Sequence, residues 1–264
     1  TLSEVHLLSE ASRLAYADRG QWLGDTDFVS VPLAGLLDAN YLAARSGLIN
    51  PMRDMGRALP GLPPMKKAEL PRYAPMPRQI ENGTSQISAV DDNGEALSMT
   101  TSVESAFGAE ISAGGFVLNN QLTDFSFQPV AGGKPVANAV AAGKRPLSSM
   151  APTLIFAPDG SFFASVGSPG GRLIIGYVAQ TVVGLIDGQM SMPAAAAAPR
   201  HINMNGATMI EANTPLVQLA PALTAMGHQV RITRFDSGVN GIKRVPGGYE
   251  GGADPHREGA ALGD

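Results

Sequence analysis

The stretch Glu81 to Asp91, which reads ENGTSQISAVD, places two hydroxyl residues directly before an alternating apolar run. A glycine followed by alternation from Ile87 to Val90 is typical of a loop that ends where a half-buried strand begins. The same residues allow a second interpretation. If the peptide bond between Gly83 and Thr84 were cut, Thr84 would carry a free α-amine beside its own hydroxyl, and this pair is a nucleophile with a built-in base.

The sequence after this strand predicts a layered α+β or α/β protein. Asn93-Gly94 favours the positive dihedral angles of a tight turn, so the runs on either side of it, 87–90 and 96–103, are expected to form a hairpin. Strand pairs interleaved with helices favour layered packing over a bundle or an all-β sandwich. The other expected elements are a second hairpin (153–157 with 162–166), a buried strand at 116–118, strands at 230–235 and 238–245, helices at 2–16, 33–49, 172–186 and 215–226, and one helical turn at 194–198.

Composition narrows the class of protein. The sequence has 264 residues, of which 44% are apolar and 16% charged, and this is ample for a buried core. A net charge of −4 provides no basic surface for nucleic acid or an anionic membrane. The absence of cysteine excludes disulfides and thiolate chemistry. Residues 51–77 are rich in proline, which removes backbone donors, so they are expected to form an extended tail that ends just before Gly83.

Several familiar catalytic patterns do not fit. The segment before Lys144 has Asn138 where a phosphate-binding loop needs its first glycine, and Arg145 stands where a hydroxyl should bind magnesium. No serine lies in a Gly-x-Ser-x-Gly turn. The histidines show no ligand spacing, so neither a serine triad nor a zinc site is expected; they are His6, His201, His228 and His256.

Three polar turns carry groups that could bind a substrate. GSPGG at 167–171 joins a predicted strand to a predicted helix and leaves backbone N–H groups able to hold an anion or a developing oxyanion. NNQLTDF at 119–125 supplies amide and carboxylate groups after an apolar strand, and KRPLSSM at 144–150 supplies two hydroxyls beside a cationic pair. Each alone is an ordinary polar turn.

Together with TSQISAVD at 84–91, these three segments closely resemble the small subunit of γ-glutamyltranspeptidases, which are N-terminal-nucleophile hydrolases. LAYADR at 14–19 and LGDTDFV at 23–29 are similar to the last part of that family's large subunit, and GGYEGGADPHREG at 247–259 resembles its C-terminal segment. The resemblance therefore covers essentially the whole sequence.

The resemblance implies a role for each matching position. Thr84 would be the nucleophile, freed by self-cleavage between Gly83 and Thr84, and Ser102 would orient its hydroxyl. The α-amino group of a γ-glutamyl substrate would be bound by Glu104, Gln121 and Asp124. The α-carboxylate would be bound by Ser148 and Ser149, and backbone N–H groups of Gly170 and Gly171 would form the oxyanion hole.

The resemblance also implies an architecture and partners. The expected fold is a four-layer αββα sandwich, incomplete in a fragment, in which residues 1–83 are the end of the large subunit with a proline-rich tail at about 51–83, and residues 84–264 are the small, catalytic subunit. The two subunits would form a heterodimer. The substrate would be glutathione or another γ-glutamyl compound, and the acceptor an amino acid, a peptide or water. No metal or organic cofactor, nucleic acid or membrane span is expected, and the location would be periplasmic or secreted.

Three differences from the family are present, and two alternatives stay open. Gln86 stands where the family usually has histidine, and the loop between Phe125 and Lys144 is short and lacks the tyrosine that gates the pocket in some members. The family's large-subunit arginine that clamps the α-carboxylate cannot be located in residues 1–83. The alternatives are a β-lactam side-chain acylase of the cephalosporin or glutaryl type, which shares the architecture, and an inactive, unprocessed fragment. A carboxylate at Glu104 and at Asp124 favours a substrate with an ammonium group over the acylase.

Overall fold

A computed structural model describes residues 1–65, 73–76 and 84–263. Helices and strands are mixed, as predicted for the α+β class. The chain divides into two compact units. Unit 1 comprises 1–79, 121–148 and 201–233, and unit 2 comprises 80–120, 149–200 and 234–264. Gly83 lies outside the described residues, so the predicted cleavage site is described only from Thr84 onward.

Unit 1 is built around the long helix α1, Leu2–Trp22, which a capping box between Thr1 and Glu4 begins. The predicted helix at 33–49 is two shorter ones, α2 (Leu33–Leu36) and α3 (Ala39–Ser46). The break lies at Asp38, whose carboxylate accepts a hydrogen bond from the N–H of Tyr41 and so begins α3 as a new helix. The prediction of one continuous helix was wrong because a capping residue interrupts the apolar spacing.

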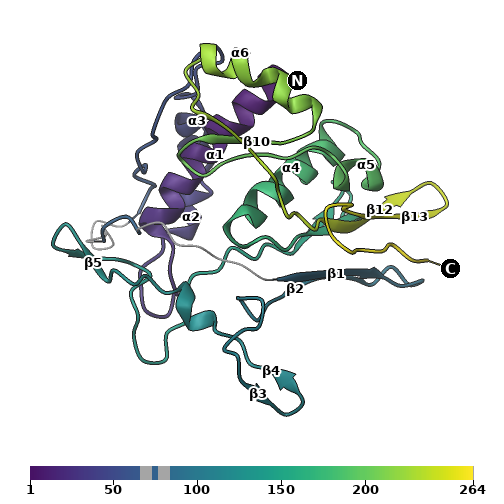
Figure 1. Cartoon of the computed structure of the whole chain (residues 1–264), viewed down its shortest axis with the longest axis horizontal. Helices are drawn as coiled ribbons and strands as arrows, with labels where there is room; N and C mark the ends of the chain where they lie inside the picture. The colour runs from purple at the N-terminus through teal and green to yellow at the C-terminus, as the bar shows by residue number, and fades with distance from the viewer. Residues whose placement is uncertain (66–72, 77–83, 264) are drawn as a thin grey trace. The chain divides into compact units, whose positions relative to one another are not determined.

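A three-stranded sheet completes unit 1, in the order β11 (Val230–Thr233), β10 (Thr208–Glu211), β9 (His201–Asn203). The parallel pair β10 and β11 is joined by the 3-10 helix η4 (Pro215–Leu219) and by α6 (Ala220–Ala225), where one continuous helix was predicted. Val5 of α1 packs against Ile210 of β10 and Leu223 of α6, so α1 lies beside the β10–α6 segment (Figure 1). The short elements of this unit are η2 (Gln121–Asp124), β5 (Val130–Ala131) and β6 (Lys134–Pro135).

Unit 2 contains both predicted hairpins. In the first, β1 (Ser85–Val90) pairs with β2 (Ala96–Thr101), and Gly94 adopts a φ of 83° in the turn. In the second, β7 (Thr153–Phe156) pairs with β8 (Phe162–Gly167), and Gly160 adopts a φ of 82°. Local turn chemistry is sufficient to predict such pairs, because a glycine reaches positive φ without a steric penalty.

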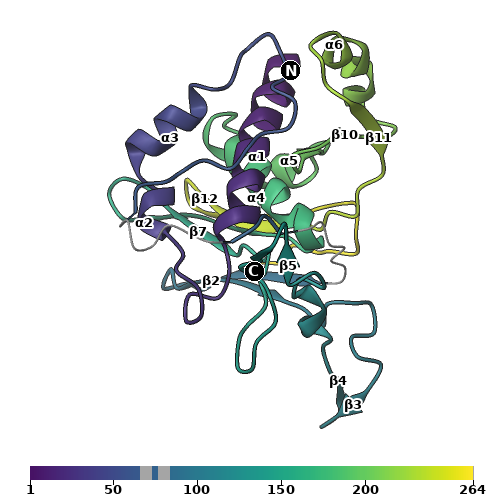
Figure 2. The ribbon, with the colours of Figure 1, turned by 90° about the vertical axis from the view of Figure 1, so that its left-hand side faces the viewer.

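Three layers stack in unit 2, as Figures 1 and 2 show. The middle layer is a four-stranded sheet in the order β13 (Gly248–Ala253), β12 (Asn240–Val245), β8, β7. On one face, Ser165 of β8 donates to the carbonyl of Leu97 in the β1–β2 hairpin. On the other, the backbone of Met192 lies so close to Gly252 of β13 that an added Cβ would come within 2.7 Å of it. The helices on that second face are α4 (Ile174–Ile186), which follows the 3-10 helix η3 (Gly171–Leu173), and α5 (Met192–Ala196). The second helical layer of the predicted four-layer sandwich stays a prediction.

One predicted strand differs in its surroundings. The apolar run at 116–118 was expected to be buried, but β4 (Phe116–Val117) pairs only with β3 (Ser112–Ala113), and Phe116 is 65% exposed. The expectation of burial was wrong because, in the described part of the chain, β3 and β4 form a two-stranded sheet of their own, and a lone hairpin offers little surface on which to bury an apolar side chain. Strands β9, β10 and β13 were not predicted from the sequence. No helix in the described part of the chain is long and apolar enough to cross a membrane.

Candidate functional site

Thr84 stands directly before β1, and the register of the hairpin determines what faces it. Because Ser85 pairs with Thr101, the next residue along β2 comes opposite Thr84. That residue is Ser102, whose Oγ accepts a hydrogen bond of 3.3 Å from Oγ1 of Thr84. The same Ser102 oxygen accepts the N–H of Glu104 at 2.9 Å. The hairpin thus brings together the predicted nucleophile and the predicted orienting hydroxyl.

Glu104 lies in a strained turn immediately after this contact. Its side chain is buried, and its φ is 73°, a conformation that non-glycine residues rarely adopt. Such strain is concentrated at functional sites, where the surrounding structure holds it. No sequence pattern indicates this conformation, although the family resemblance implies that Glu104 binds substrate.

Arg257 was missed in the sequence. One of its guanidinium nitrogens, Nη1, donates to the backbone carbonyl of Thr84 at 3.3 Å, while Nε donates to the carbonyl of Asp236 at 3.1 Å. These bonds anchor the residue that carries the candidate nucleophile to the C-terminal segment of unit 2. A separation of 173 residues leaves no local pattern from which the pair could be predicted.

Gln86 holds the start of β1 in place. Its amide nitrogen donates to Ser98 at 3.1 Å, and its amide oxygen accepts a bond of 2.5 Å from Thr100. The side chain also lies over Gly167, where an added Cβ would come within 2.1 Å of the amide carbon. Gln86 therefore locks β1 to β2 and to the end of β8 through uncharged contacts.

The Gly170–Gly171 turn follows β8 and leads into η3 and α4. Gly170 has a φ of 131° and Gly171 a φ of 55°. An added Cβ on Gly170 would lie 2.5 Å from Cε2 of Tyr177, so this position admits only glycine. The ring of Tyr177 is fully buried and packs against the turn at Gly170. Two consecutive glycines in such a turn leave their N–H groups able to donate hydrogen bonds to an anion.

The remaining predicted residues divide between the units. In unit 1, Gln121 and Asp124 hydrogen-bond each other within η2, and the carbonyl of Asp124 accepts the side-chain amide of Asn138 at 2.7 Å. Asp124 is buried. Ser148, the last residue of unit 1 in this segment, is exposed, and Ser149, the first of unit 2, is buried. The roles of all the predicted site residues stay proposals.

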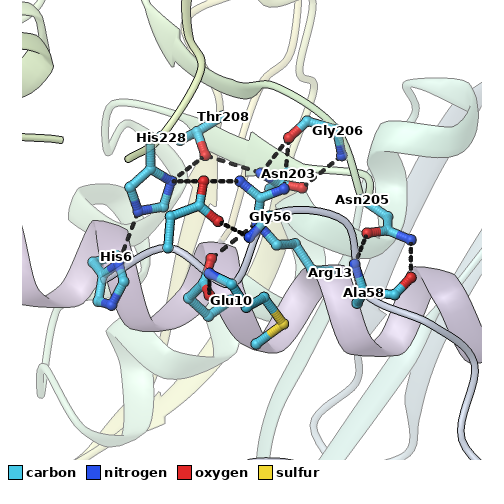
Figure 3. Close-up of polar contacts among 12 residues, drawn as sticks. His6, Glu10, Arg13, Gly56, Ala58, Asn203, Asn205, Gly206, Thr208 and His228 are labelled. Atoms are coloured by element: carbon cyan, nitrogen blue, oxygen red, sulfur yellow. Dashed lines mark hydrogen bonds and ion pairs between the residues drawn. The ribbon is translucent and has the colours of Figure 1, made fainter. Parts of the chain in front are cut away.

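Two histidines that looked unrelated in the sequence meet in unit 1. Nδ1 of His6 on α1 lies 2.7 Å from Nε2 of His228 (Figure 3). Nε2 of His6 lies 2.7 Å from the carbonyl oxygen of Asn50. Nδ1 of His228 lies 2.8 Å from Oγ1 of Thr208. His6 and His228 are buried. The separation of 222 residues explains why sequence spacing did not reveal this pair.

Carboxylates and one arginine complete this cluster. Arg13 donates to Glu10 at 2.9 Å and to Asp54 at 3.1 Å, so one guanidinium balances two carboxylates (Figure 3). Asp54 lies 3.9 Å from Nδ1 of His228. Burial raises the pKa of Glu10, against the opposing effects of the Met55 N–H and Arg13. Burial also lowers the pKa of His228, and Asp54 partly offsets that effect.

Potential ligand atoms of His6, Glu10 and His228 lie within 4.8 Å of one another, which is close enough for a metal ion. The hydrogen bonds described above already occupy the histidine nitrogens, however, and Arg13 already supplies a positive charge to Glu10. The arrangement is that of a self-contained polar network, and we assign no metal to it.

Comparison with known proteins identifies the family. The family model described as Gamma-glutamyltranspeptidase matches residues 1–264. A glutathione hydrolase proenzyme of Bacillus subtilis is 37% identical over 98% of this chain and 45% of its own length. An acylase proenzyme of a Pseudomonas species is 34% identical over 94% of this chain and 41% of its own length.

A solved structure agrees with the sequence comparison. A mutant γ-glutamyltranspeptidase of Helicobacter pylori has a TM-score of 0.59 and 34% identity, and the match covers 65% of this chain and 99% of that one. This likeness, together with the mixed helices and sheets, confirms the predicted α+β fold of the N-terminal-nucleophile hydrolase type. The chain spans less than half of the length of the curated relatives named here. It belongs to the γ-glutamyltranspeptidase family.

Proposed function

We propose that the protein that contains this chain cleaves γ-glutamyl amides such as glutathione and passes the γ-glutamyl group to water or to an acceptor amine. The hydrogen bond between Thr84 and Ser102 is the observation that carries the proposal, because it orients a hydroxyl at the first residue of the predicted small subunit. Family membership supplies the reaction class.

Before the first turnover, self-cleavage hydrolyses the Gly83–Thr84 bond: one water is consumed, Gly83 keeps the new carboxylate, and Thr84 gains a free α-amine. This amine takes the proton from the Thr84 hydroxyl as the oxygen attacks the γ-carbonyl of the substrate. Collapse of the tetrahedral intermediate breaks the amide bond, gives the proton to the leaving amine and leaves a γ-glutamyl ester on Thr84. Water or an acceptor amine then attacks the ester, and the Thr84 oxygen recovers its proton.

Donors and charges for the other parts of the substrate come from the proposed site residues. Backbone N–H groups of Gly170 and Gly171 would stabilise the oxyanion, and the open turn at these glycines supports this role. Carboxylates suit the ammonium of the γ-glutamyl group, and hydroxyls suit its carboxylate. The proposed ammonium site is Glu104, Gln121 and Asp124, and the proposed carboxylate site is Ser148 and Ser149.

The proposed mature protein is a heterodimer in which residues 1–83 belong to the large subunit and residues 84–264 form the small one. The word proenzyme in the names of the relatives supports a processed precursor. A periplasmic or secreted location is proposed from the family resemblance alone. No cofactor takes part in the proposed steps.

The acylase relative makes β-lactam side-chain cleavage the second candidate. The two differ in the substrate's ammonium group, which a glutaryl group lacks and a γ-glutamyl group carries. Turnover of a γ-glutamyl anilide should therefore exceed turnover of the matched glutaryl anilide, and the reverse order would favour the acylase.

The test of the proposed function uses the full-length protein and two variants. Thr84→Ala should abolish both chain cleavage, seen by mass spectrometry, and turnover of a γ-glutamyl anilide. Ser85→Ala removes the exposed hydroxyl of the next residue and should leave both intact, so it is the matched control. Undiminished turnover by Thr84→Ala would overturn the proposal, and an uncut, inactive wild type would support the reading of an unprocessed fragment.

A further inference from the structure

Unit 1 is made of segments from both predicted subunits. Residues 1–79 precede the proposed cleavage point, whereas 121–148 and 201–233 follow it. If the Gly83–Thr84 bond is cut, as the proposed function requires, this compact unit loses its covalent link and must hold together by packing alone. The contacts between these segments therefore belong to the interface between the subunits.

Apolar and polar contacts both cross this interface. Val5 packs against Ile210 and Leu223 in a buried cluster. Beside this cluster, backbone and side-chain hydrogen bonds join the two segments: Arg13 to the carbonyl of Gly206 at 2.8 Å, the N–H of Asp54 to the carbonyl of Met226 at 2.8 Å, and Ala58 with Asn205 in both directions at 2.8 and 2.9 Å.

The His6–His228 pair is a contact in this interface that can change with pH. The carbonyl oxygen of Asn50 can only accept, so Nε2 of His6 carries a hydrogen and, in the neutral ring, Nδ1 accepts. Nε2 of His228 then donates to His6, and Nδ1 of His228 accepts from the hydroxyl of Thr208. Each ring nitrogen therefore has one hydrogen-bond partner while both rings are neutral.

Protonation is limited by the geometry of this pair. One added proton can be accommodated on Nδ1 of His228. That N–H would donate to the hydroxyl oxygen of Thr208, 2.8 Å away, and would lie near the carboxylate of Asp54 at 3.9 Å. A second proton cannot be accommodated, because two N–H groups would then face each other across 2.7 Å in a buried site. The charged groups around the pair are Glu10 and Arg13 of α1 and Asp54 of the following loop.

We propose that His6, Glu10, Arg13, Asp54, Thr208 and His228 form a histidine latch that holds the two subunits together after cleavage and that weakens when the histidine pair becomes doubly protonated. This inference rests on the proposed function, because these contacts form a subunit interface only if the Gly83–Thr84 bond is cut. The partner that the latch binds is the other half of the same precursor: His6, Glu10, Arg13 and Asp54 lie before the cut, and Thr208 and His228 lie after it.

The direction of the pH effect follows from proton counting. Burial lowers the pKa of His228, so below the ordinary value of 6.5 the separated chains bind more protons than the latch does. The equilibrium constant for separation should therefore rise as the pH falls, by up to about tenfold per pH unit for each excluded proton. Glu10 acts in the opposite direction, because its raised pKa makes the latched form take up a proton more readily.

The experiment measures subunit separation in the cut, full-length protein. In a fixed, moderate urea concentration, the fraction of separated chains is determined by size-exclusion chromatography at pH 7.5 and pH 5.5. The wild type should separate more at pH 5.5. His6→Gln with His228→Gln removes both imidazole rings, so this double variant should separate more readily at pH 7.5 and should lose most of the pH dependence. If it does not fold, His228→Gln alone serves for the same comparison.

Control variants distinguish an effect of the histidine pair from a general effect of pH or of replacing any histidine. His256→Gln removes a histidine of unit 2 and should follow the wild type. The same pH dependence in the double variant as in the wild type would overturn the latch. If mass spectrometry shows that the wild type is not cut, the proposed function fails. Hydrogen exchange of the α1 amides in the uncut chain then tests the latch. The protection factors of these amides should fall between pH 7.5 and pH 5.5 in the wild type and should not fall when both histidines are replaced. Protection that is independent of pH in the uncut wild type would contradict the proposal.

Discussion

The hydroxyl oxygen of Thr84 lies 3.3 Å from the hydroxyl oxygen of Ser102, although 18 residues separate them in the chain. The antiparallel register of β1 and β2 is the reason, since Ser85 pairs with Thr101. Ser102 also accepts the backbone N–H of Glu104, so its hydroxyl is held by two neighbours. A fixed hydroxyl acceptor of this kind limits the rotamers of the Thr84 side chain.

We therefore expect Ser102→Ala to lower kcat for a γ-glutamyl anilide by up to about tenfold, because one neutral hydrogen bond contributes about 0.5–1.5 kcal/mol. Ser102→Thr keeps a hydroxyl and should retain most of the activity. Steady-state kinetics of the full-length variants make the comparison. Equal loss in both variants would show that packing, not the hydroxyl, is what the position supplies.

Gly170→Ala should destabilise the protein more than Gly115→Ala does, although both glycines have a positive φ. An added Cβ on Gly170 would clash with Tyr177, whereas Gly115, at a φ of 88°, has no heavy atom within 4 Å of the same position. We expect about 1–2 kcal/mol for Gly115→Ala from backbone strain and about 1–3 kcal/mol more for Gly170→Ala from overpacking. Urea unfolding measures both, and equal losses would contradict the close approach of Tyr177.

Tyr177→Phe should stabilise the protein. Among the described residues, the buried hydroxyl of Tyr177 has no hydrogen-bond partner, while its ring packs under Gly170 and beside Phe235. Removing the hydroxyl relieves an unmet desolvation cost, so the free energy of unfolding should rise by about 1 kcal/mol. Thermal unfolding provides the measurement, with Tyr177→Leu, which loses the ring, expected to destabilise. A loss of stability in Tyr177→Phe would indicate that the hydroxyl has a partner.

The buried carboxylate of Asp25 predicts a second pH effect, at lower pH than that of the histidine latch. It accepts hydrogen bonds from the backbone N–H of Arg145 at 2.8 Å and from its guanidinium at 2.6 and 3.1 Å, and these bonds lower the pKa of Asp25 well below its ordinary value of 3.8. The folded chain therefore binds fewer protons than the unfolded chain in acid. The stabilisation is present above that ordinary value and is lost as the pH falls below it.

Asp25→Asn should accordingly lower the urea midpoint at pH 7 and flatten its decline between pH 5 and pH 3. Asp27, the other partner of Arg145, has a side chain that is 72% exposed, so Asp27→Asn should change the midpoint much less. An unchanged decline in Asp25→Asn would show that other carboxylates dominate the acid response.

Features with a local cause were predictable from the sequence. Asn93-Gly94 and Asp159-Gly160 determine both hairpins through their turns, and the apolar run that forms α4 follows a glycine turn that is visible in the sequence. The pairing of Thr84 with Ser102 is a consequence of one such hairpin. Family resemblance then supplied a role for Thr84 that its spacing alone left open.

Features with a long-range cause were not predictable. His6 meets His228 across 222 residues, and Arg257 reaches Thr84 across 173. No periodicity connects such positions, because only the packing of α1 on β10 and of the C-terminal segment on β1 brings them together. The break at Asp38 has a local cause and was still missed. A single capping residue between two short helices interrupts the apolar spacing only briefly, so the two helices were predicted as one.

The central claim is that Thr84 acts with its own free α-amine as the base. The most direct test is intact-mass and N-terminal analysis of the active full-length protein, combined with its turnover of a γ-glutamyl anilide. We expect a chain that begins at Thr84 to appear together with activity, and we expect neither of the two in Thr84→Ala. An active protein whose backbone remains continuous from Gly83 to Thr84 would contradict this mechanism.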